Sequence, residues 1–499
     1  MGNPTLTEDL ECRWPARFGS WAERSPDHRA LCRTVRTIPW RLRPPTVNDV
    51  REVLKEAASH RTPIWPISRG CNWGYGSHLP ARNGSVILDL SRLDAISDLD
   101  RPSLSLRIEP GVSQTGLFKY LQLHAPDLAF NVTGAGGETS VLGNALERGI
   151  GYGGEKDRDV FAIEALLPDG TSVGPTEGRN HNARANAAGF STDSLFIQSN
   201  FGIVLGARLR LRIRQEAEDV AILQGPFDAL MITLKRAYER QLFVLPTHVG
   251  EPGRSRRVSF GLLRTLWNRD PTDDELDRCF PEQRWFVGLT PLHGRRRVVK
   301  AMWRELHRAK MPGVSLQKGS ARMIDFAAKW LGRVGARYKA ARLLALRPLL
   351  AFTWGEPGDA GLNSLDGYLV GSNPDHSSFG AIYGNAVSSF DPGEAQRAAG
   401  IVRARWKESA FTWILVDNRS ILTIYTLHFS ENQASEAHDA NVAIVEELRR
   451  SGLPQYRLDI STPAAPGAEA VVNRLKGAFD PLGLIAPGRY ETLCADASK

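Results

Sequence analysis

The stretch Pro66-Ile-Ser-Arg-Gly-Cys-Asn-Trp-Gly-Tyr-Gly76 decides which fold we expect. An apolar strand is predicted before it, at 63–67, and a second after it, at 85–90. Its three glycines leave backbone N–H groups open to an anion, because no Cβ stands in the way. A strand rather than a helix follows the loop, so it is neither a Walker sequence nor a dinucleotide-binding turn. We interpret it as a phosphate cradle, with an ordinary tight turn as the alternative.

A second glycine-rich segment runs from Val132 to Gly154. It reads Val-Thr-Gly-Ala-Gly-Gly-Glu-Thr-Ser-Val-Leu-Gly-Asn, followed by Ala-Leu-Glu-Arg-Gly-Ile-Gly-Tyr-Gly-Gly. Such a density of glycine is unlike a plain helix or strand, since glycine weakens both. It indicates that the backbone approaches a flat or charged ligand closely.

The rest of the chain shows ordinary helix and strand patterns. Thr46-Val-Asn-Asp49 is typical of a capping box before an amphipathic helix. Helical spacing predicts helices at 228–239, 296–309, 395–406 and 434–450, and apolar runs predict strands at 410–415 and 421–429. A hairpin is predicted over 160–173. We interpret 318–350, rich in Arg and Leu, as helical core rather than a site.

The order of strand, glycine-rich loop and strand resembles the FAD-binding domain of the vanillyl-alcohol oxidase and p-cresol methylhydroxylase (PCMH) family. Gly143-Asn144, Glu147–Tyr152 and the C-terminal Asn473–Tyr490 carry the resemblance further. It implies an α+β protein with a PCMH-type FAD-binding domain of two α+β subdomains, and an α+β cap or substrate domain with an antiparallel sheet. The expected boundaries are 1–215 for the FAD domain, 216–455 for the cap domain, and 456–499 for a return to the FAD domain.

The resemblance implies that FAD is bound by three parts of the chain. In the family the first loop wraps the pyrophosphate, the second segment lies along the isoalloxazine and ribityl parts, and the backbone near 202–204 meets the adenine side. Arg489 would add a positive charge near the flavin or the substrate, with a purely structural arginine as the equal alternative. The cofactor-binding residues that we expect are Ser68, Arg69, Gly70, Cys71, Asn72, Gly76, Ser77, Gly136, Gly137, Gly143, Asn144, Gly151, Tyr152, Gly202, Ile203, Val204 and Arg489.

We expect the FAD to be held without a covalent bond. Ala381 stands where some family members attach the cofactor through a histidine, although Tyr383 nearby leaves a tyrosyl link open. In the first loop, Cys71 stands where other flavoproteins of the wider superfamily carry a histidine, and a buried, inert thiol is the simpler interpretation. The second segment contains no cysteine, which argues against a doubly attached flavin.

Tyr75, Tyr456 and Arg457 fall where the alkylphenol oxidisers of the family hold the substrate as a phenolate. A phenol has a pKa of about 10, so its ionisation at neutral pH needs donors and a permanent positive charge. The resemblance therefore implies hydride transfer from a para-substituted phenol to flavin N5, which leaves a quinone methide. The alternative keeps FAD but uses an alcohol, an amine or a secondary-metabolite intermediate without a free phenol.

Two departures and one carboxylate complete the expected site. The strand at 419–425 lacks the paired histidines that phenol oxidisers often carry, and His428 is a stand-in or a structural residue. Asp157 is expected near flavin N5, where it would tune the potential or act as a base. A shifted alignment would place Asp159 rather than Asp157 near flavin N5. The alternative for both residues is a loop carboxylate that pairs with a neighbouring lysine or arginine and has no role at the flavin.

Composition limits the classes of protein and partner. With 499 residues, of which 42% are hydrophobic, the chain can bury more than one core. No apolar run approaches the roughly 18 residues of a membrane span, and residues 1–9 lack a secretory signal, so we expect a soluble, cytoplasmic protein. The five cysteines are scattered, and we expect no metal site and no disulfide framework.

The net charge of +8 and the basic clusters at 254–257 and 295–300 raise the question of nucleic acid. No nucleic-acid motif accompanies them, so a solvated basic face is the favoured interpretation, and a non-enzymatic binding protein ranks low. We expect as partners a small aromatic substrate and molecular oxygen or another electron acceptor, but no nucleic acid and no membrane. The oligomeric state stays open, with a homodimer as one option.

Overall fold

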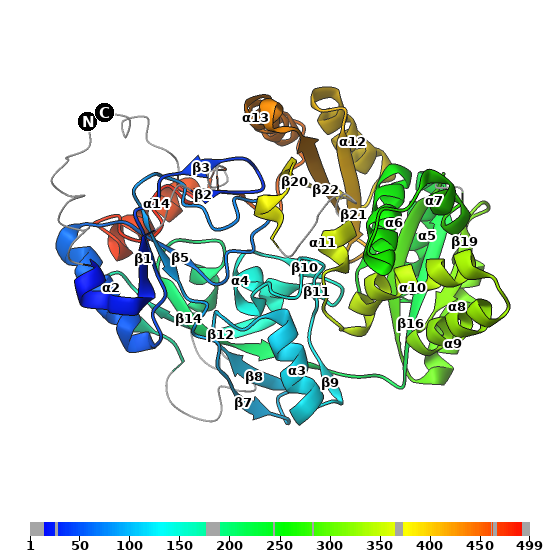
Figure 1. Cartoon of the computed structure of the whole chain (residues 1–499), viewed down its shortest axis with the longest axis horizontal. Helices are drawn as coiled ribbons and strands as arrows, with labels where there is room; N and C mark the ends of the chain where they lie inside the picture. Colours follow the sequence, from blue (N-terminus) through cyan, green and yellow to red (C-terminus); the bar gives the residue numbers. More distant parts are fainter. Residues whose placement is uncertain are drawn as a thin grey trace.

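The computed structural model describes residues 14–24, 28–175, 190–242, 245–281, 284–364, 373–460, 462 and 467–491. Residues 1–9, on which the secretory signal was judged, lie outside this part of the chain. Figure 1 shows two lobes, one coloured blue, cyan and red and the other green, yellow and orange. The chain therefore builds the first lobe, crosses to the second, and returns to the first at its end.

The first glycine-rich loop joins two parallel strands of a small sheet. Strands β5 (Ile64–Ile67) and β6 (Val86–Asp89) pair in parallel, in the order β1 (Ala22–Arg24), β4 (Trp40–Leu42), β6, β5. Parallel neighbours cannot be joined by a two-residue turn, so residues 68–85 cross from one strand end to the other strand's start. Helix α2 (Val47–His60) precedes β5 and has the predicted capping box between Thr46 and Asp49.

The second half of this lobe is an antiparallel sheet that carries the second glycine-rich segment beside it. Its strand order is β13 (Ser172–Val173), β12 (Val160–Leu166), β14 (Ile203–Arg210), β8 (Ser105–Ile108), β7 (Ile96–Asp100). Helices α3 (Gln114–His124) and α4 (Val141–Leu146) are capped by Ser113 and Ser140, which meet in an isolated bridge. This bridge fixes the start of α4 against the start of α3. Because α4 belongs to the second glycine-rich segment, the bridge also positions that segment.

The second lobe is built on a seven-stranded antiparallel sheet. Its order is β19 (Ser315–Gly319), β16 (Ala217–Gly225), β18 (Phe286–Gly294), β17 (Thr247–Gly250), β21 (Ser409–Leu415), β22 (Ser420–Phe429), β20 (Gly380–Ser389). Because successive side chains of a strand point to opposite faces, Ala221 and Leu223 join one core while Val220 and Ile222 join another. The sheet therefore separates two layers of helices.

The two layers have different partners. Helices α5 (Phe227–Glu239), α8 (Arg296–Ala309), α12 (Pro392–Arg405) and α13 (Ala434–Arg450) pack on the core that contains Leu223. Helices α9 (Ala321–Arg333) and α10 (Arg337–Ala351) pack on the face of Val220, and α6 (Pro252–Trp267) and α11 (Ala360–Ser364) contact each other beside them. Each face of the sheet is therefore covered by its own set of helices.

The last described residues close the first lobe. Helix α14 (Glu469–Phe479) holds Lys476, whose ammonium donates to the carbonyls of Asn200 (2.8 Å) and Ile485 (2.6 Å). Ile485 in turn forms a parallel bridge with Ile64 at the start of β5. The C-terminal segment is thus joined to β5, directly before the first glycine-rich loop. Within the described residues, no helix combines the length and apolar character needed to cross a membrane.

Candidate active site

Two cavities meet between the lobes. A cleft of about 160 Å³ lies in the first lobe, and a cavity of about 460 Å³ lies under the seven-stranded sheet. Cys71, Asn72, Asn144 and Arg457 line both. Ligand pockets usually measure about 300–1,000 Å³, so the larger cavity has the size of a substrate site. The two spaces are therefore neighbours that share a wall.

The cleft gathers most of the residues that we expected to bind the cofactor. It is lined by Ser68, Arg69, Gly70, Cys71, Asn72, Ser77, Gly143, Asn144, Gly202, Val204 and Arg489. A Cβ on Gly143 would lie 2.7 Å from the Ser68 hydroxyl oxygen, so glycine lets α4 approach the first loop. Backbone, hydroxyl groups and the three guanidinium groups of Arg69, Arg457 and Arg489 therefore surround a narrow space, which suits the phosphate-bearing part of FAD.

Six expected cofactor residues do not line the cleft. Tyr152 lines the larger cavity instead, whereas Gly76, Gly136, Gly137, Gly151 and Ile203 line neither space. At three of these glycines an added Cβ would collide with a neighbouring side chain. The Cβ would lie 2.5 Å from Ile460 at position 76, 2.5 Å from Leu362 at position 136, and 2.1 Å from Asn131 at position 151. Close packing of the chain on itself therefore explains these glycines, and their contact with FAD remains a prediction.

Glu147 holds two arginines at the junction of the cavities. Its carboxylate accepts from Arg489 (2.5 Å) and from the Tyr490 hydroxyl (3.0 and 2.9 Å), and it lies 3.9 Å from Arg457. Burial alone would raise the pKa of Glu147, but Arg489 and Arg457 outweigh it and hold the pKa below its ordinary value. One carboxylate against two guanidinium groups leaves a net positive charge here.

Arg457 lies on the ring of Tyr75. Its guanidinium carbon is 4.3 Å from the ring centroid, and it donates to the side-chain oxygen of Asn72. Tyr75 stacks on Tyr383 with centroids 5.9 Å apart. Asn385 of β20 accepts from the backbone N–H of Arg457 (3.0 Å) and donates to its carbonyl (2.9 Å). These contacts fix Arg457 and Tyr75 in the wall of the larger cavity.

Tyr456 lies in the same wall with an unsatisfied hydroxyl. Its oxygen is buried and has no hydrogen-bond partner among the described residues. Its ring lies under the Arg148 guanidinium, 4.4 Å from the centroid, and its carbonyl accepts from Arg148 at 3.0 Å. Burial, together with the charge of Asp157, raises the pKa of Tyr456. A buried hydroxyl without a partner is costly, so a ligand atom in the cavity would satisfy it.

Asp157 and Asp159 both lie outside the cavity lining. The carboxylate of Asp157 is 3.8 Å from Arg148 and influences Tyr456, whereas Asp159 accepts from Asn131 at 2.8 Å. Burial raises the pKa of Asp159 to about 6. Of the two, Asp157 is therefore coupled to a cavity residue and Asp159 is part of the sheet's interior.

The thiol and the tyrosine considered for covalent attachment are both near the site. Burial raises the pKa of Cys71 to about 12, so its thiol stays protonated at neutral pH. Ala381 is buried on β20 and offers no nucleophile. Tyr383 lines the cavity, and a Cβ on Gly74 would lie only 1.7 Å from its ring. The first loop is therefore packed directly against Tyr383.

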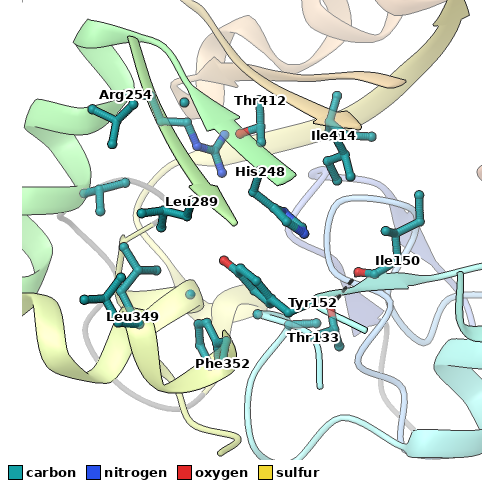
Figure 2. Close-up of a pocket in the computed structure, with 18 of the residues that line it drawn as sticks. Thr133, Ile150, Tyr152, His248, Arg254, Leu289, Leu349, Phe352, Thr412 and Ile414 are labelled. Carbon is teal, nitrogen blue, oxygen red and sulfur yellow. Dashed lines mark hydrogen bonds between the residues drawn. The ribbon is translucent and has the colours of Figure 1, made fainter. Parts of the chain in front are cut away.

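The sequence did not indicate the aromatic stack at the centre of the cavity. Figure 2 shows Tyr152 between His248 of β17 and Phe352; the ring centroids are 4.2 Å and 5.6 Å from that of Tyr152. Burial lowers the pKa of His248 to about 4, so the imidazole is neutral at pH 7. Nearby, the Thr133 hydroxyl donates to the Ile150 carbonyl at 3.3 Å. A lone histidine on a short strand carries no sequence signal of such a position.

The segment 318–350 forms helices, as predicted, but the expectation that it is not part of a site is wrong. One face of α9 and α10 lines the larger cavity through Ile324, Arg342, Leu343, Leu346, Leu349 and Leu350. Helical periodicity predicts an apolar face but does not say whether that face meets protein or a cavity. The wall that α9 and α10 form is therefore mostly apolar, with Arg342 as its charged residue.

Comparisons with known proteins agree with this geometry. Residues 40–174 match the family model described as an FAD binding domain. Two solved structures share the fold. One is p-cresol methylhydroxylase with bound substrate, which is 18% identical with a TM-score of 0.79 over 98% of this chain and 97% of that chain. The other is 4-ethylphenol oxidase from Gulosibacter chungangensis, which is 17% identical with a TM-score of 0.79 over 98% of each chain. The chain carries a PCMH-type FAD-binding domain. The predicted fold class and FAD as cofactor are thereby confirmed.

Two curated relatives extend the comparison. The chain is 27% identical to 1'-carboxy-chondrochloren decarboxylase of Chondromyces crocatus over 94% of its length and 93% of the relative. It is 33% identical to the flavoprotein subunit of 4-cresol dehydrogenase [hydroxylating] of Pseudomonas putida over 32% of each chain. The chain therefore has an FAD binding domain and shares its fold with p-cresol methylhydroxylase.

Proposed function

We propose that the enzyme oxidises a para-substituted phenol, with Tyr75, Tyr456 and Arg457 as the phenol-binding residues. The observation that carries this proposal is the buried hydroxyl of Tyr456, which has no partner among the described residues and lines the same cavity as Arg457. FAD, when bound, supplies the chemistry by accepting a hydride from the carbon next to the ring. Ser68, Asn72, Gly143 and Arg489 are among the cleft residues that would hold it.

The residues of this chain would hold the substrate as an anion. Lowering a phenol's pKa from about 10 to about 7 takes about 4 kcal/mol of preferential stabilisation of the phenolate. Two hydrogen bonds to a charged acceptor supply about 1.5–3 kcal/mol each, and Arg457 adds a charge that is never lost. Two tyrosine hydroxyls and one guanidinium are therefore enough to ionise the phenol at neutral pH. Glu147 does not cancel the charge of Arg457, because its carboxylate is shared with Arg489.

Anaerobic reduction of the holoenzyme tests the proposal. We expect p-ethylphenol to bleach the flavin and p-ethylanisole, its methyl ether, to leave it oxidised. Tyr456→Phe and Arg457→Leu should keep FAD but slow bleaching by about 100-fold or more. Tyr338→Phe is the matched control, because Tyr338 does not line the cavity. Unchanged bleaching rates in both cavity variants would refute the phenol-binding role.

A second candidate is oxidative decarboxylation of a phenol that carries a carboxylate. It is supported by the relative that is named a decarboxylase and by a larger cavity lined by no described Asp or Glu. A hydride would leave the carbon next to the ring, the neighbouring carbon would lose CO₂, and the released electron pair would form the C=C bond. With p-hydroxyphenylpropanoate, this reaction gives p-vinylphenol and CO₂, whereas oxidation alone keeps the carboxylate. Product analysis therefore separates the two candidates.

A further inference from the structure

The larger cavity is lined by five cationic side chains and by no described carboxylate. These side chains are Arg148, Arg254, Lys318, Arg342 and Arg457. Three have acidic partners outside the lining: Asp157 lies 3.8 Å from Arg148, Asp219 lies 2.5 Å from Lys318, and Glu147 lies 3.9 Å from Arg457. The charge of these three is therefore balanced by the protein itself, at least in part.

Arg254 and Arg342 differ from the other three. Within the described residues, neither has an ion pair or a side-chain hydrogen bond, and both are partly buried. Arg342 lies over the ring of Phe280 at 5.7 Å, and burial lowers its pKa. A guanidinium that is partly removed from water without a carboxylate is unfavourable. A ligand anion in the cavity would compensate it.

Arg254 is the better placed of the two. It lies in the first turn of α6, the end of the helix with partial positive charge, and that turn lines the cavity through Arg254 and Ser255, beside Gly250 at the end of β17. Figure 2 shows its side chain extending toward His248 and Tyr152. Burial lowers the pKa of His248 to about 4 and raises the pKa of Tyr152 to about 12, and the charge of Arg254 acts on both rings in the lowering direction. Both rings are neutral at pH 7, so they bring no competing charge.

We propose that Arg254 binds a carboxylate of the substrate, so that the enzyme acts on an aromatic carboxylic acid. This inference rests on the proposed use of the larger cavity as the substrate site. A single guanidinium matches a carboxylate in charge and in its paired donors. A phosphate carries nearly two charges and needs more donors than the apolar neighbours Leu289, Leu349 and Phe352 provide. Arg342, on the other helix, attracts the same group toward the cavity.

Four probes test the inference on the holoenzyme by calorimetric titration. They are p-hydroxyphenylpropanoate, its methyl ester, and the two corresponding p-methoxy compounds. We expect the free acids to bind at least tenfold more tightly than their esters, because the ester has no charge for Arg254 to pair with. Arg254→Gln should reduce this preference to less than threefold, and Arg254→Lys should keep part of it. Arg256→Gln is the matched control on the same helix, since Arg256 pairs with Asp273 and Asp277 and does not line the cavity.

The probes separate this inference from the phenol proposal. If the p-methoxy compounds bind more weakly than the p-hydroxy compounds, and by the same factor for the acid and the ester, the loss of affinity reports on the phenol site alone. An acid preference that persists in the p-methoxy pair and disappears in Arg254→Gln supports the carboxylate site even if the phenol site is wrong. Equal binding of acid and ester by the unaltered enzyme, or an acid preference that survives Arg254→Gln, would overturn the inference. Retained flavin absorbance in each variant shows that the fold is intact.

Discussion

Replacing Glu147 by glutamine should destabilise the protein although the shape of the side chain is kept. The carboxylate of Glu147 contacts Arg489 and Tyr490 and also lies near Arg457. Its side chain is 23% exposed to the cleft, whereas that of Arg489 is 9% exposed. Glutamine keeps an acceptor oxygen but removes the charge, so the buried guanidinium of Arg489 would be left without a counter-ion.

The expected loss is about 2–3 kcal/mol. Breaking a buried pair by removing one partner costs about 3–5 kcal/mol, and the exposure of Glu147 to the cleft reduces that figure through solvent screening. For a folding unit of about 200 residues this corresponds to a Tm lower by about 4–12 °C. The effect should depend on pH, because a carboxyl whose folded pKa is depressed stabilises the fold above its unfolded pKa. The difference should be complete at neutral pH and should shrink only as pH falls below the ordinary value of 4.5.

Thermal unfolding of the holoenzyme at fixed excess FAD measures this difference. Glu138→Gln is the matched control, because that side chain is 63% exposed and pairs with Arg69 at the surface; we expect a change within about 0.5 kcal/mol. A Glu147→Gln variant that unfolds within 1 °C of the unaltered protein at pH 7 would show that the carboxylate does not hold the two arginines. A difference that grows as the pH is lowered would contradict the charge assignment itself.

Three further predictions concern the loop, the acid near the cavity and the cofactor. Gly74→Ala should cost about 3 kcal/mol or more in unfolding free energy, because its Cβ would meet Tyr383 at 1.7 Å with φ at +72°; Gly84→Ala, with φ at +80° and open space, should cost only about 1 kcal/mol. Asp157→Asn should lower the pKa of Tyr456 and move the alkaline limb of the flavin-reduction pH profile to lower pH, and an unmoved limb would show that the two groups are not coupled. Acid precipitation should release the yellow cofactor into the supernatant, since the thiol of the first loop stays protonated; colour in the pellet would contradict this.

Local patterns predicted the elements better than their arrangement. The helix at 296–309 and the capping box at Thr46 are found as expected, because spacing and caps act over a few residues. The strand order of the seven-stranded sheet could not be predicted from local patterns. Strand β17 pairs with β21, some 160 residues later in the chain, and no local feature of either strand encodes this pairing. The resemblance implied an antiparallel sheet in the cap domain, but neither it nor periodicity gave the strand order.

The same division applies to the site. The first loop could be interpreted from its glycines, since backbone freedom is visible in a sequence. Arg254 could not, because it appeared only as one member of a basic cluster at 254–257. Its neighbours Arg256 and Arg257 do not line the cavity, and which of the arginines does so depends on the rotation of α6 against the sheet. That rotation is set by packing between distant residues.

The parallel bridge between Ile64 and Ile485 has a consequence for how the protein is made. The wall of the cleft contributed by residues 65–77 leaves the ribosome before the wall contributed by 485–489. At about 5–20 residues per second, the roughly 400 residues between them take about 20–80 s to translate. During that time the edge of β5 that will pair with Ile485 is open. The nascent chain can therefore pair β5 with β6 early, but it can enclose a cofactor only after residues 485–489 have been translated.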